Sequence, residues 1–160
     1  QIKMAEQLLG GLDNCSLSVQ DFMNTDYDNN TFDIVYFCES ICHNIFEKVI
    51  SESYRILKPG GTLYIKDLVI KCSKDKLSEN NLNKLNHFMD SWCYEVFDIE
   101  TIMDKIDSIG GFKLINNKKF IKPSVHWINA VRNSGLKKYH EAKSDNMPPI
   151  RGADFLYKKI

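Results

Sequence analysis

Hydrophobic and polar positions along this 160-residue chain repeat with two periods, which predict helices and strands in alternation. Residues 1–9 place apolar side chains at the spacing of one helix face. Residues 15–20 alternate apolar and polar side chains and predict a short strand, whereas the polar residues 24–31 predict a loop. The continuous apolar run at 32–38 predicts a strand covered by helices on both faces, as in parallel sheets.

The middle of the chain predicts one strand–helix–strand unit. Residues 44–57 carry an apolar stripe on one helix face. The charged side chains of that helix are expected to face solvent: Glu47, Lys48, Glu52 and Arg55. A proline and two glycines at 58–61 end the helix before a strand at 62–70. Such a unit crosses over right-handedly, so both strands belong to one sheet.

The remaining pattern adds two helices and two strands. A helix is predicted at 78–92, another at 99–109 with Asp98 as its cap, and strands at 112–121 and 153–159. Because no clear helix separates the last two strands, we expect them to pair antiparallel. The order predicts a doubly wound α/β sheet, mostly parallel with an antiparallel last strand.

Composition narrows the class of protein. The chain is 43% hydrophobic and 26% charged, as globular domains are. Its 21 basic and 21 acidic residues cancel, so neither a nucleic acid nor an anionic membrane surface is expected as a partner. No apolar run reaches the length of about 18 residues that a membrane helix needs. The five cysteines form no C-x-x-C pair, which favours reduced thiols in a cytoplasmic protein without a metal site.

Three segments carry a recognisable combination of residues. They are Val19-Gln20-Asp21-Phe22, then Thr31–Tyr36 running into Glu39-Ser40-Ile41-Cys42-His43, and finally ESYRILKPGGTL at 52–63. Together they resemble the class I S-adenosylmethionine-dependent methyltransferases, whose E-x-x-R-x-L-K-P-G-G-x-L element is the most specific match. Ile109-Gly110-Gly111-Phe112 is similar to the turn before that family's sixth strand. The resemblance implies a Rossmann-like fold, S-adenosylmethionine as cofactor, and methyl transfer to a carbon, nitrogen or oxygen atom of a small molecule.

One part of the family pattern has no counterpart in this chain. The glycine-rich loop after the family's first strand and the acidic residue after its second are both missing. Residues 1–160 are therefore expected to form a partial domain, with a core at 1–121 and 152–160 and an insertion at 122–151 that caps the substrate cleft. We expect this segment alone not to bind the cofactor tightly. A non-catalytic methyltransferase-like subunit or remnant is the alternative, and a nicotinamide-dependent dehydrogenase fits the K-P-G-G element poorly.

The resemblance also implies roles for individual residues. Asp21 is similar to the residue that accepts a hydrogen bond from the adenine amino group, and Phe22 would cover the adenine ring. Cys38 and Glu39 stand where backbone groups hold the methionine part of the cofactor. Glu39 and His43 are the catalytic candidates, because this stretch is similar to E-(A/S)-x-x-H in sterol and related C-methyltransferases. Histidine is a suitable base near neutral pH.

Simpler structural roles compete with these assignments. Asp21 is also explained as a turn residue, and His43 as a residue that packs at a helix start. Side chains of the expected cap are candidates for substrate binding, since aromatic rings attract cationic groups: His87, Trp92, Tyr94 and Trp127. The alternative for Trp92 is packing of its helix onto the sheet.

Overall fold

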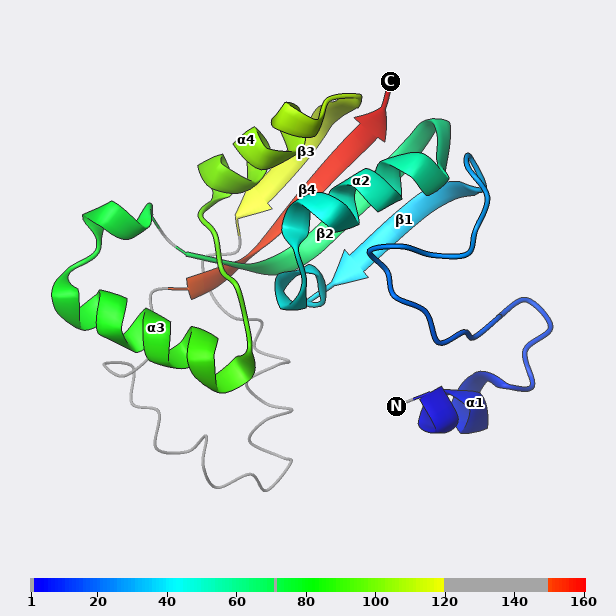
Figure 1. Ribbon diagram of the computed structural model, residues 1–160, viewed down its shortest axis with the longest axis horizontal. Coiled ribbons are helices and arrows are strands. Elements are labelled where there is room, and N and C mark those ends of the chain that lie inside the picture. The colour runs from blue at the N-terminus through cyan, green and yellow to red at the C-terminus, as the bar shows by residue number, and fades with distance from the viewer. Residues whose placement is uncertain (1, 71, 120–149) are drawn as a thin grey trace.

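A computed structural model gives the fold of the chain and describes residues 2–70, 72–119 and 150–160 (Figure 1). One sheet has the strand order β1-β2-β4-β3. Its strands are β1 (Phe32–Cys38), β2 (Leu57–Ile70), β3 (Phe112–Lys119) and β4 (Ile150–Lys159). Strand β2 is parallel to β1, and β4 runs antiparallel to both of its neighbours, β2 and β3. Three strands thus share one direction, and the predicted α/β sheet with an antiparallel last strand is confirmed.

Helices α2 (Phe46–Ile56) and α4 (Ile99–Ile109) cover one face of the sheet (Figure 1). Val49, Ile50 and Ile106 of these helices are fully buried, together with Leu63 and Phe155 of the sheet. Each such side chain contributes about 1.5–3 kcal/mol when it leaves water. The apolar stripe predicted for the helix at 44–57 therefore forms the centre of the core.

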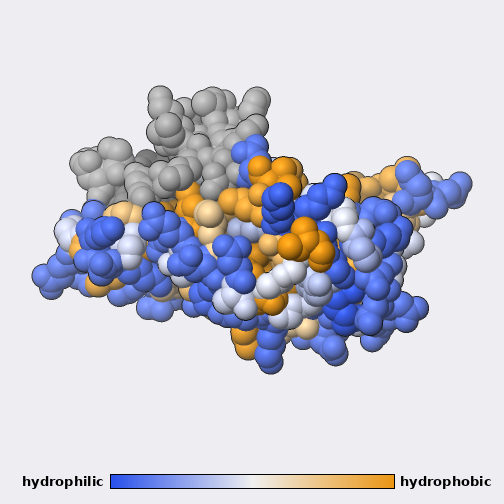
Figure 2. Space-filling model, turned by 90° about the horizontal axis from the view of Figure 1, so that it is seen from above, coloured by the Kyte–Doolittle hydropathy of each residue, from blue (hydrophilic) through white to orange (hydrophobic). Residues whose placement is uncertain are grey.

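The opposite face of the sheet is open among the described residues. Ile34 and Tyr36 of β1 point to it and are 65% and 55% exposed, whereas Val35 and Phe37 pack into the core. Among the described residues β1 is covered on one face only, contrary to the expectation of two covered faces, because α2 and α4 lie on the same side. Apolar side chains accordingly reach the surface among hydrophilic ones, as the orange atoms in Figure 2 show.

The amino-terminal region departs furthest from expectation. Helix α1 (Ile2–Leu9) forms as predicted but buries none of its residues. Residues 15–20 form no strand, and Leu17 and Val19 are exposed. An alternating pattern yields a strand only where another strand offers a free edge for pairing, and no described strand pairs with this segment. The loop predicted at 24–31 is confirmed.

The helix ends and short turns set the finer boundaries. A 3₁₀ turn, η1 (Ile41–His43), precedes α2, and a second, η2 (Lys74–Lys76), precedes α3 (Glu79–Trp92). Strand β2 begins at Leu57, earlier than the predicted residue 62, because Leu57 already pairs with Phe32 of β1. Gly61 is required there, since a Cβ atom would lie 2.8 Å from the Lys58 carbonyl oxygen.

The predicted cap of α4 is in place. The Asp98 carboxylate accepts a hydrogen bond from the Thr101 N–H at 2.9 Å and so begins α4. Helix α3 packs through Leu85 on a smaller cluster with Ile70 and Val96.

The insertion expected at 122–151 lies almost wholly outside the described residues. Within the described parts, no helix is both long and apolar enough to cross a membrane.

Candidate functional site

All four candidate cofactor residues lie at the carboxyl end of β1. Cys38 is the last residue of the strand, and the Glu39 N–H donates to the backbone of β2 at 2.7 Å, which extends the pairing by one residue. The rings of Phe22 and Phe37 are 5.9 Å apart, which brings Asp21 and Phe22 to the same end. Ligands of open α/β sheets bind at this end of the strands. The geometry therefore suits a ligand site at this rim.

Glu39 has an unusual backbone. Its φ is +51°, in the left-handed region that non-glycine residues rarely adopt, and its side chain is exposed. Such a conformation costs about 1–3 kcal/mol and persists where the surrounding structure enforces it, often at functional sites. Asp21 is also exposed, and its Oδ1 accepts a hydrogen bond from the Met23 N–H at 2.9 Å. Asp21 thus does stabilise a turn, and its other oxygen is not used by that turn.

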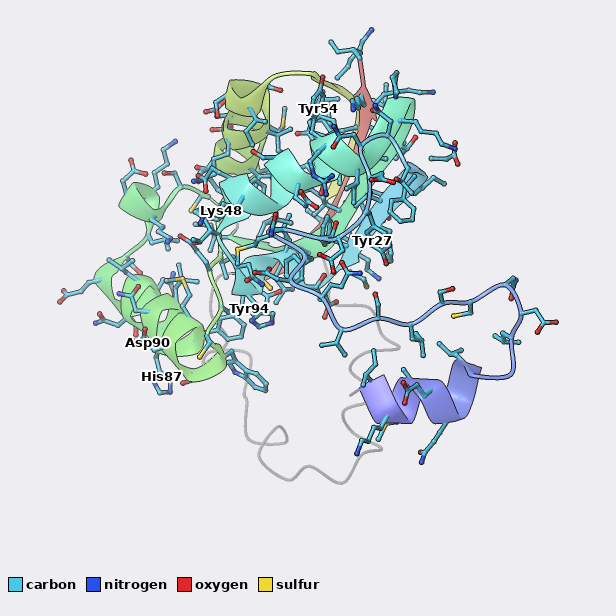
Figure 3. All side chains as sticks on the ribbon, turned by 45° about the vertical axis from the view of Figure 1, so that its right-hand side comes forward. Tyr27, Lys48, Tyr54, His87, Asp90 and Tyr94 are labelled. Carbon is cyan, nitrogen blue, oxygen red and sulfur yellow. The ribbon has the colours of Figure 1, made fainter. Side chains whose placement is uncertain are left out.

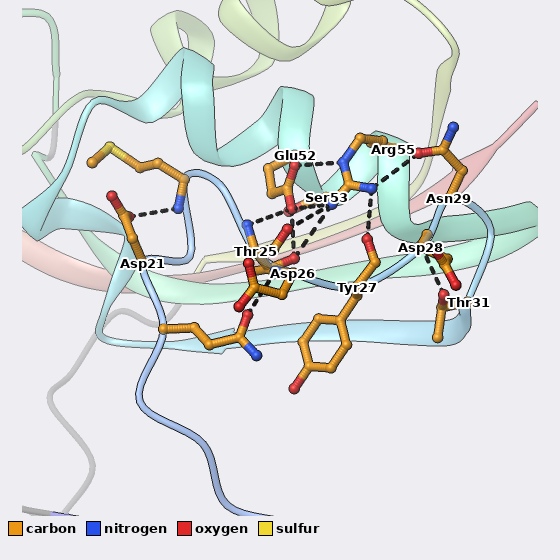
Figure 4. Close-up of polar contacts among 12 residues, drawn as sticks. Asp21, Thr25, Asp26, Tyr27, Asp28, Asn29, Thr31, Glu52, Ser53 and Arg55 are labelled. Carbon is orange, nitrogen blue, oxygen red and sulfur yellow. Dashed lines mark hydrogen bonds and ion pairs between the residues drawn. The ribbon is translucent and has the colours of Figure 1, made fainter.

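The loop at 24–31, which follows Asp21 and leads into β1, is held by Arg55 and Glu52 (Figure 4). Arg55 donates to the carbonyl oxygens of Thr25 at 3.1 Å and Tyr27 at 2.7 Å, and forms an ion pair with Glu52 at 2.7 Å. Glu52 also accepts the Thr25 N–H at 2.8 Å and its hydroxyl at 2.6 Å. These four residues tie the loop to α2.

The burial of Glu52 corrects the expectation that it faces solvent. Its side chain is buried, with the residue 7% exposed, because the loop covers that side of α2. The hydrogen bond from Arg55, followed by those from Thr25, lowers the pKa of Glu52 to about 2. Glu52 is therefore ionised at neutral pH, and its hydrogen-bond partners among the described residues, Thr25 and Arg55, are all donors.

His43 is held by a different part of the chain. Its Nδ1 lies 3.0 Å from the carbonyl oxygen of Cys93, just beyond the end of α3. Since a carbonyl only accepts, this hydrogen bond requires the proton on Nδ1 and leaves Nε2 as the basic nitrogen. The Tyr94 ring meets the imidazole edge-on, with centroids 5.0 Å apart. The structure thus brings together two residues, His43 and Tyr94, that are distant in sequence.

A buried carboxylate that the sequence analysis missed lies behind this pair. Asp67 of β2 is 3% exposed, and the Tyr94 hydroxyl donates to its Oδ1. Burial, followed by the Asp67 charge, raises the pKa of Tyr94, and burial raises the pKa of Cys42 to about 12. The sequence did contain a signal for this site: Asp67 stands at a position of an apolar strand that faces the core, where a carboxylate is rarely buried without a partner.

The other substrate candidates lie apart from this cluster. His87 is on the outer side of α3 and points away from the sheet, whereas Tyr94 lies between α3 and the sheet (Figure 3). Trp92, in the last turn of α3, is 53% exposed, and the buried residue of that helix is Leu85. Trp127 is outside the described residues. Nowhere in the described ranges do three or more His, Cys, Asp or Glu side chains form a metal-binding group.

Comparisons with known proteins agree with this architecture. Residues 1–65 match the family model described as a methyltransferase domain. Sterol 24-C-methyltransferase of Saccharomyces cerevisiae is 48% identical over 62 residues, which cover 38% of this chain and 15% of the yeast protein. Phosphoethanolamine N-methyltransferase of Plasmodium falciparum is 26% identical over 147 residues, which cover 90% of this chain and 52% of that protein. The chain thus spans about half or less of these curated relatives.

The fold also matches a solved structure. A putative sarcosine dimethylglycine methyltransferase from Galdieria sulphuraria superposes with a TM-score of 0.74 at 15% identity. The superposition covers 98% of this chain and 64% of that one. At this identity the match establishes the fold, and it confirms the predicted Rossmann-like architecture.

Proposed function

We propose, from the premise that this chain has the sequence motifs and the fold of a class I S-adenosylmethionine-dependent methyltransferase, that its protein methylates a small molecule. The observation that carries the proposal is the convergence of Asp21, Phe22, Cys38 and Glu39 on one rim of the sheet. The family match over residues 1–65 contains all four. In this proposal the chain is part of a methyltransferase domain, with residues 122–151 as its cap.

The cofactor supplies an electrophilic methyl group on a sulfonium sulfur. On this chain, the exposed Asp21 carboxylate would accept a hydrogen bond from the adenine amino group, and Phe22 would cover the ring. The backbone at Cys38 and Glu39 would hold the methionine part. The left-handed turn at Glu39 supports this role, because it fixes the direction of the backbone where β1 ends.

His43 and Glu39 are the catalytic residues of the proposal. An acceptor that carries a proton on or next to the methylated atom must lose that proton. The Nε2 atom of His43 would take that proton, while the Glu39 carboxylate would orient the substrate or stabilise positive charge on it. Alignment of the acceptor, the methyl carbon and the sulfur supplies much of the remaining rate enhancement.

For the substrate, the proposal names the residues that would contact it and its chemical class. Tyr94, Trp92, His87 and Trp127 would line or cap the substrate cleft, and Tyr94 has the strongest support because its ring contacts His43. The balanced charge of the chain favours a small molecule over a nucleic acid. Five cysteines without a disulfide among them support a cytoplasmic location.

The test uses the full protein and S-adenosylmethionine with a labelled methyl group. The acceptors are a sterol, phosphoethanolamine and dimethylglycine, chosen from the names of the similar proteins. We expect transfer to one class and a fall of about 100-fold for Glu39→Gln, with cofactor affinity retained. Glu100→Gln, an exposed residue on α4, is the matched control. Unchanged turnover of Glu39→Gln removes Glu39 from the mechanism, and a full protein that neither binds the cofactor nor transfers methyl supports the non-catalytic alternative.

A further inference from the structure

Asp67 is a buried carboxylate that the proposed mechanism does not use. It lies on β2 between Ile65 and Val69, at a position where the alternation of the strand points side chains into the core. Its Oδ1 accepts the Tyr94 hydroxyl and the Leu68 N–H, the latter at 2.7 Å. Among the described residues, Oδ2 has no hydrogen-bond partner. A carboxylate in such a place is costly, so packing alone does not explain it.

The hydroxyl of Tyr94 connects this carboxylate to the turn that holds His43. Residue Cys93 has φ +49° and ends α3, and its carbonyl oxygen faces His43 Nδ1. The Tyr94 N–H donates to the Met89 carbonyl at 2.9 Å, and the Glu95 N–H donates to the Cys42 carbonyl at 2.8 Å. The turn at 93–95 is thus fastened on three sides: to α3, to η1 and, through Asp67, to β2.

We infer that Asp67, acting through Tyr94, is a positioning residue that keeps His43 protonated on Nδ1 and leaves Nε2 free to accept the substrate proton. The inference rests on the proposed function, in which His43 is the base. The two tautomers of a neutral imidazole are close in free energy, so the acceptor opposite Nδ1 selects between them. That acceptor is a backbone carbonyl of a left-handed turn, and its place depends on the neighbouring side chain, Tyr94.

The space around Asp67 permits this role. A cavity of about 10 Å³, about the size of one water molecule, adjoins Asp67, and its walls include Ile41, Cys42 and Phe97. The wall is mostly apolar, and the Tyr94 hydroxyl is a side-chain group that donates to Asp67. A water molecule in this cavity would find few polar groups besides Asp67, so it would not hold the turn at 93–95 as the Tyr94 hydroxyl does.

The test measures the tautomer directly. Nitrogen-15 spectra of His43 in the full protein are expected to show the proton on Nδ1. Tyr94→Phe keeps the ring beside His43 and removes the hydroxyl, so the fold is retained while the turn loosens. We expect this variant to show a mixture of tautomers and a fall in kcat of about 10-fold, with the KM for S-adenosylmethionine within about two-fold. Asp67→Asn is expected to act in the same direction.

Tyr54→Phe is the matched control, because it removes a hydroxyl from another half-buried tyrosine, on α2. It should leave the His43 tautomer and kcat unchanged. A folded Tyr94→Phe protein whose His43 keeps its proton entirely on Nδ1 overturns the inference, whatever its activity. If the tautomer shifts in Tyr94→Phe but His43→Gln retains full turnover, the positioning role stands and the assignment of His43 as base fails.

Discussion

Two buried carboxylates on this side of the sheet differ in how completely they are hydrogen-bonded. Glu52 on α2 accepts four hydrogen bonds from Thr25 and Arg55. Asp67 on β2 uses one oxygen, while the other has no partner among the described residues. A satisfied buried network stabilises and specifies a structure, whereas an unsatisfied polar atom needs another reason to persist. This difference indicates that Glu52 stabilises the fold, whereas Asp67 is the better candidate for a functional role.

The largest expected effect is on the Glu52 side. Arg55→Ala leaves the Glu52 charge buried beside Thr25 without its cation and releases the loop at 24–31. We expect the free energy of unfolding to fall more than in any other variant, since Glu52 and the loop lose their shared cation, although solvent around the one-third exposed Arg55 already screens part of that interaction. Urea denaturation measures it, with the exposed Lys48→Ala as control. A loss below about 0.5 kcal/mol would show that the network does not stabilise the loop.

The pH dependence of stability has the same origin. Folded Glu52 has a pKa of about 2, against a reference value of 4.5, so between these pH values the unfolded chain binds more protons. Stability from this group is therefore present above pH 4.5 and is lost as the pH falls towards 2; the total is less than about 3 kcal/mol, because solvent at the one-third exposed Arg55 screens the pair. Denaturation midpoints from pH 5 to 2 test this, and Glu52→Gln should flatten the slope. An equal slope in that variant assigns the effect to other groups.

The Asp67 side should respond differently. Replacing both partners, as Asp67→Leu with Tyr94→Phe, removes the buried polar pair rather than half of it. We expect stability to change by no more than about 1 kcal/mol, because exchange of both partners for apolar groups is nearly neutral. Methyl transfer by the full protein should fall in the same variant. If this double variant loses as much stability as Arg55→Ala does, Asp67 and Tyr94 stabilise the fold as Glu52 and Arg55 do, and the proposed difference between the two carboxylates is wrong.

The smallest expected effect concerns Glu39, next to the functional side. Glu39→Gly relieves the left-handed backbone and should raise the free energy of unfolding by about 0.5–1 kcal/mol. Activity of the full protein should nevertheless fall, because the carboxylate is gone. Glu39→Gln, which keeps the backbone cost, separates the two contributions. If the Glu39→Gly protein is less stable, the left-handed backbone of Glu39 is not strained; if it is also fully active, the Glu39 carboxylate has no catalytic role.

Much of the fold was predictable because its signals are local. The stripe of α2, the Asp98 cap and the K-P-G-G element each act within a few residues, and all three predicted the observed elements. The strand expected at 15–20 failed for the converse reason, since a strand needs a partner that its own residues do not specify. The K-P-G-G segment itself joined β2 for the same reason, through pairing with β1.

In the candidate site, too, the local features were predictable and the contacts between distant residues were not. The resemblance of two short segments, Val19–Phe22 and Thr31–His43, to a methyltransferase family was sufficient to select Asp21, Glu39 and His43 as candidates, because a family motif is a short contiguous pattern. Which nitrogen of His43 carries the proton, and which carboxylate stands behind it, depends on Cys93, Tyr94 and Asp67. Local sequence determined the elements and the motif of this protein. Only the tertiary structure decided which polar groups meet, because burial and hydrogen bonding are set by residues far apart in the chain.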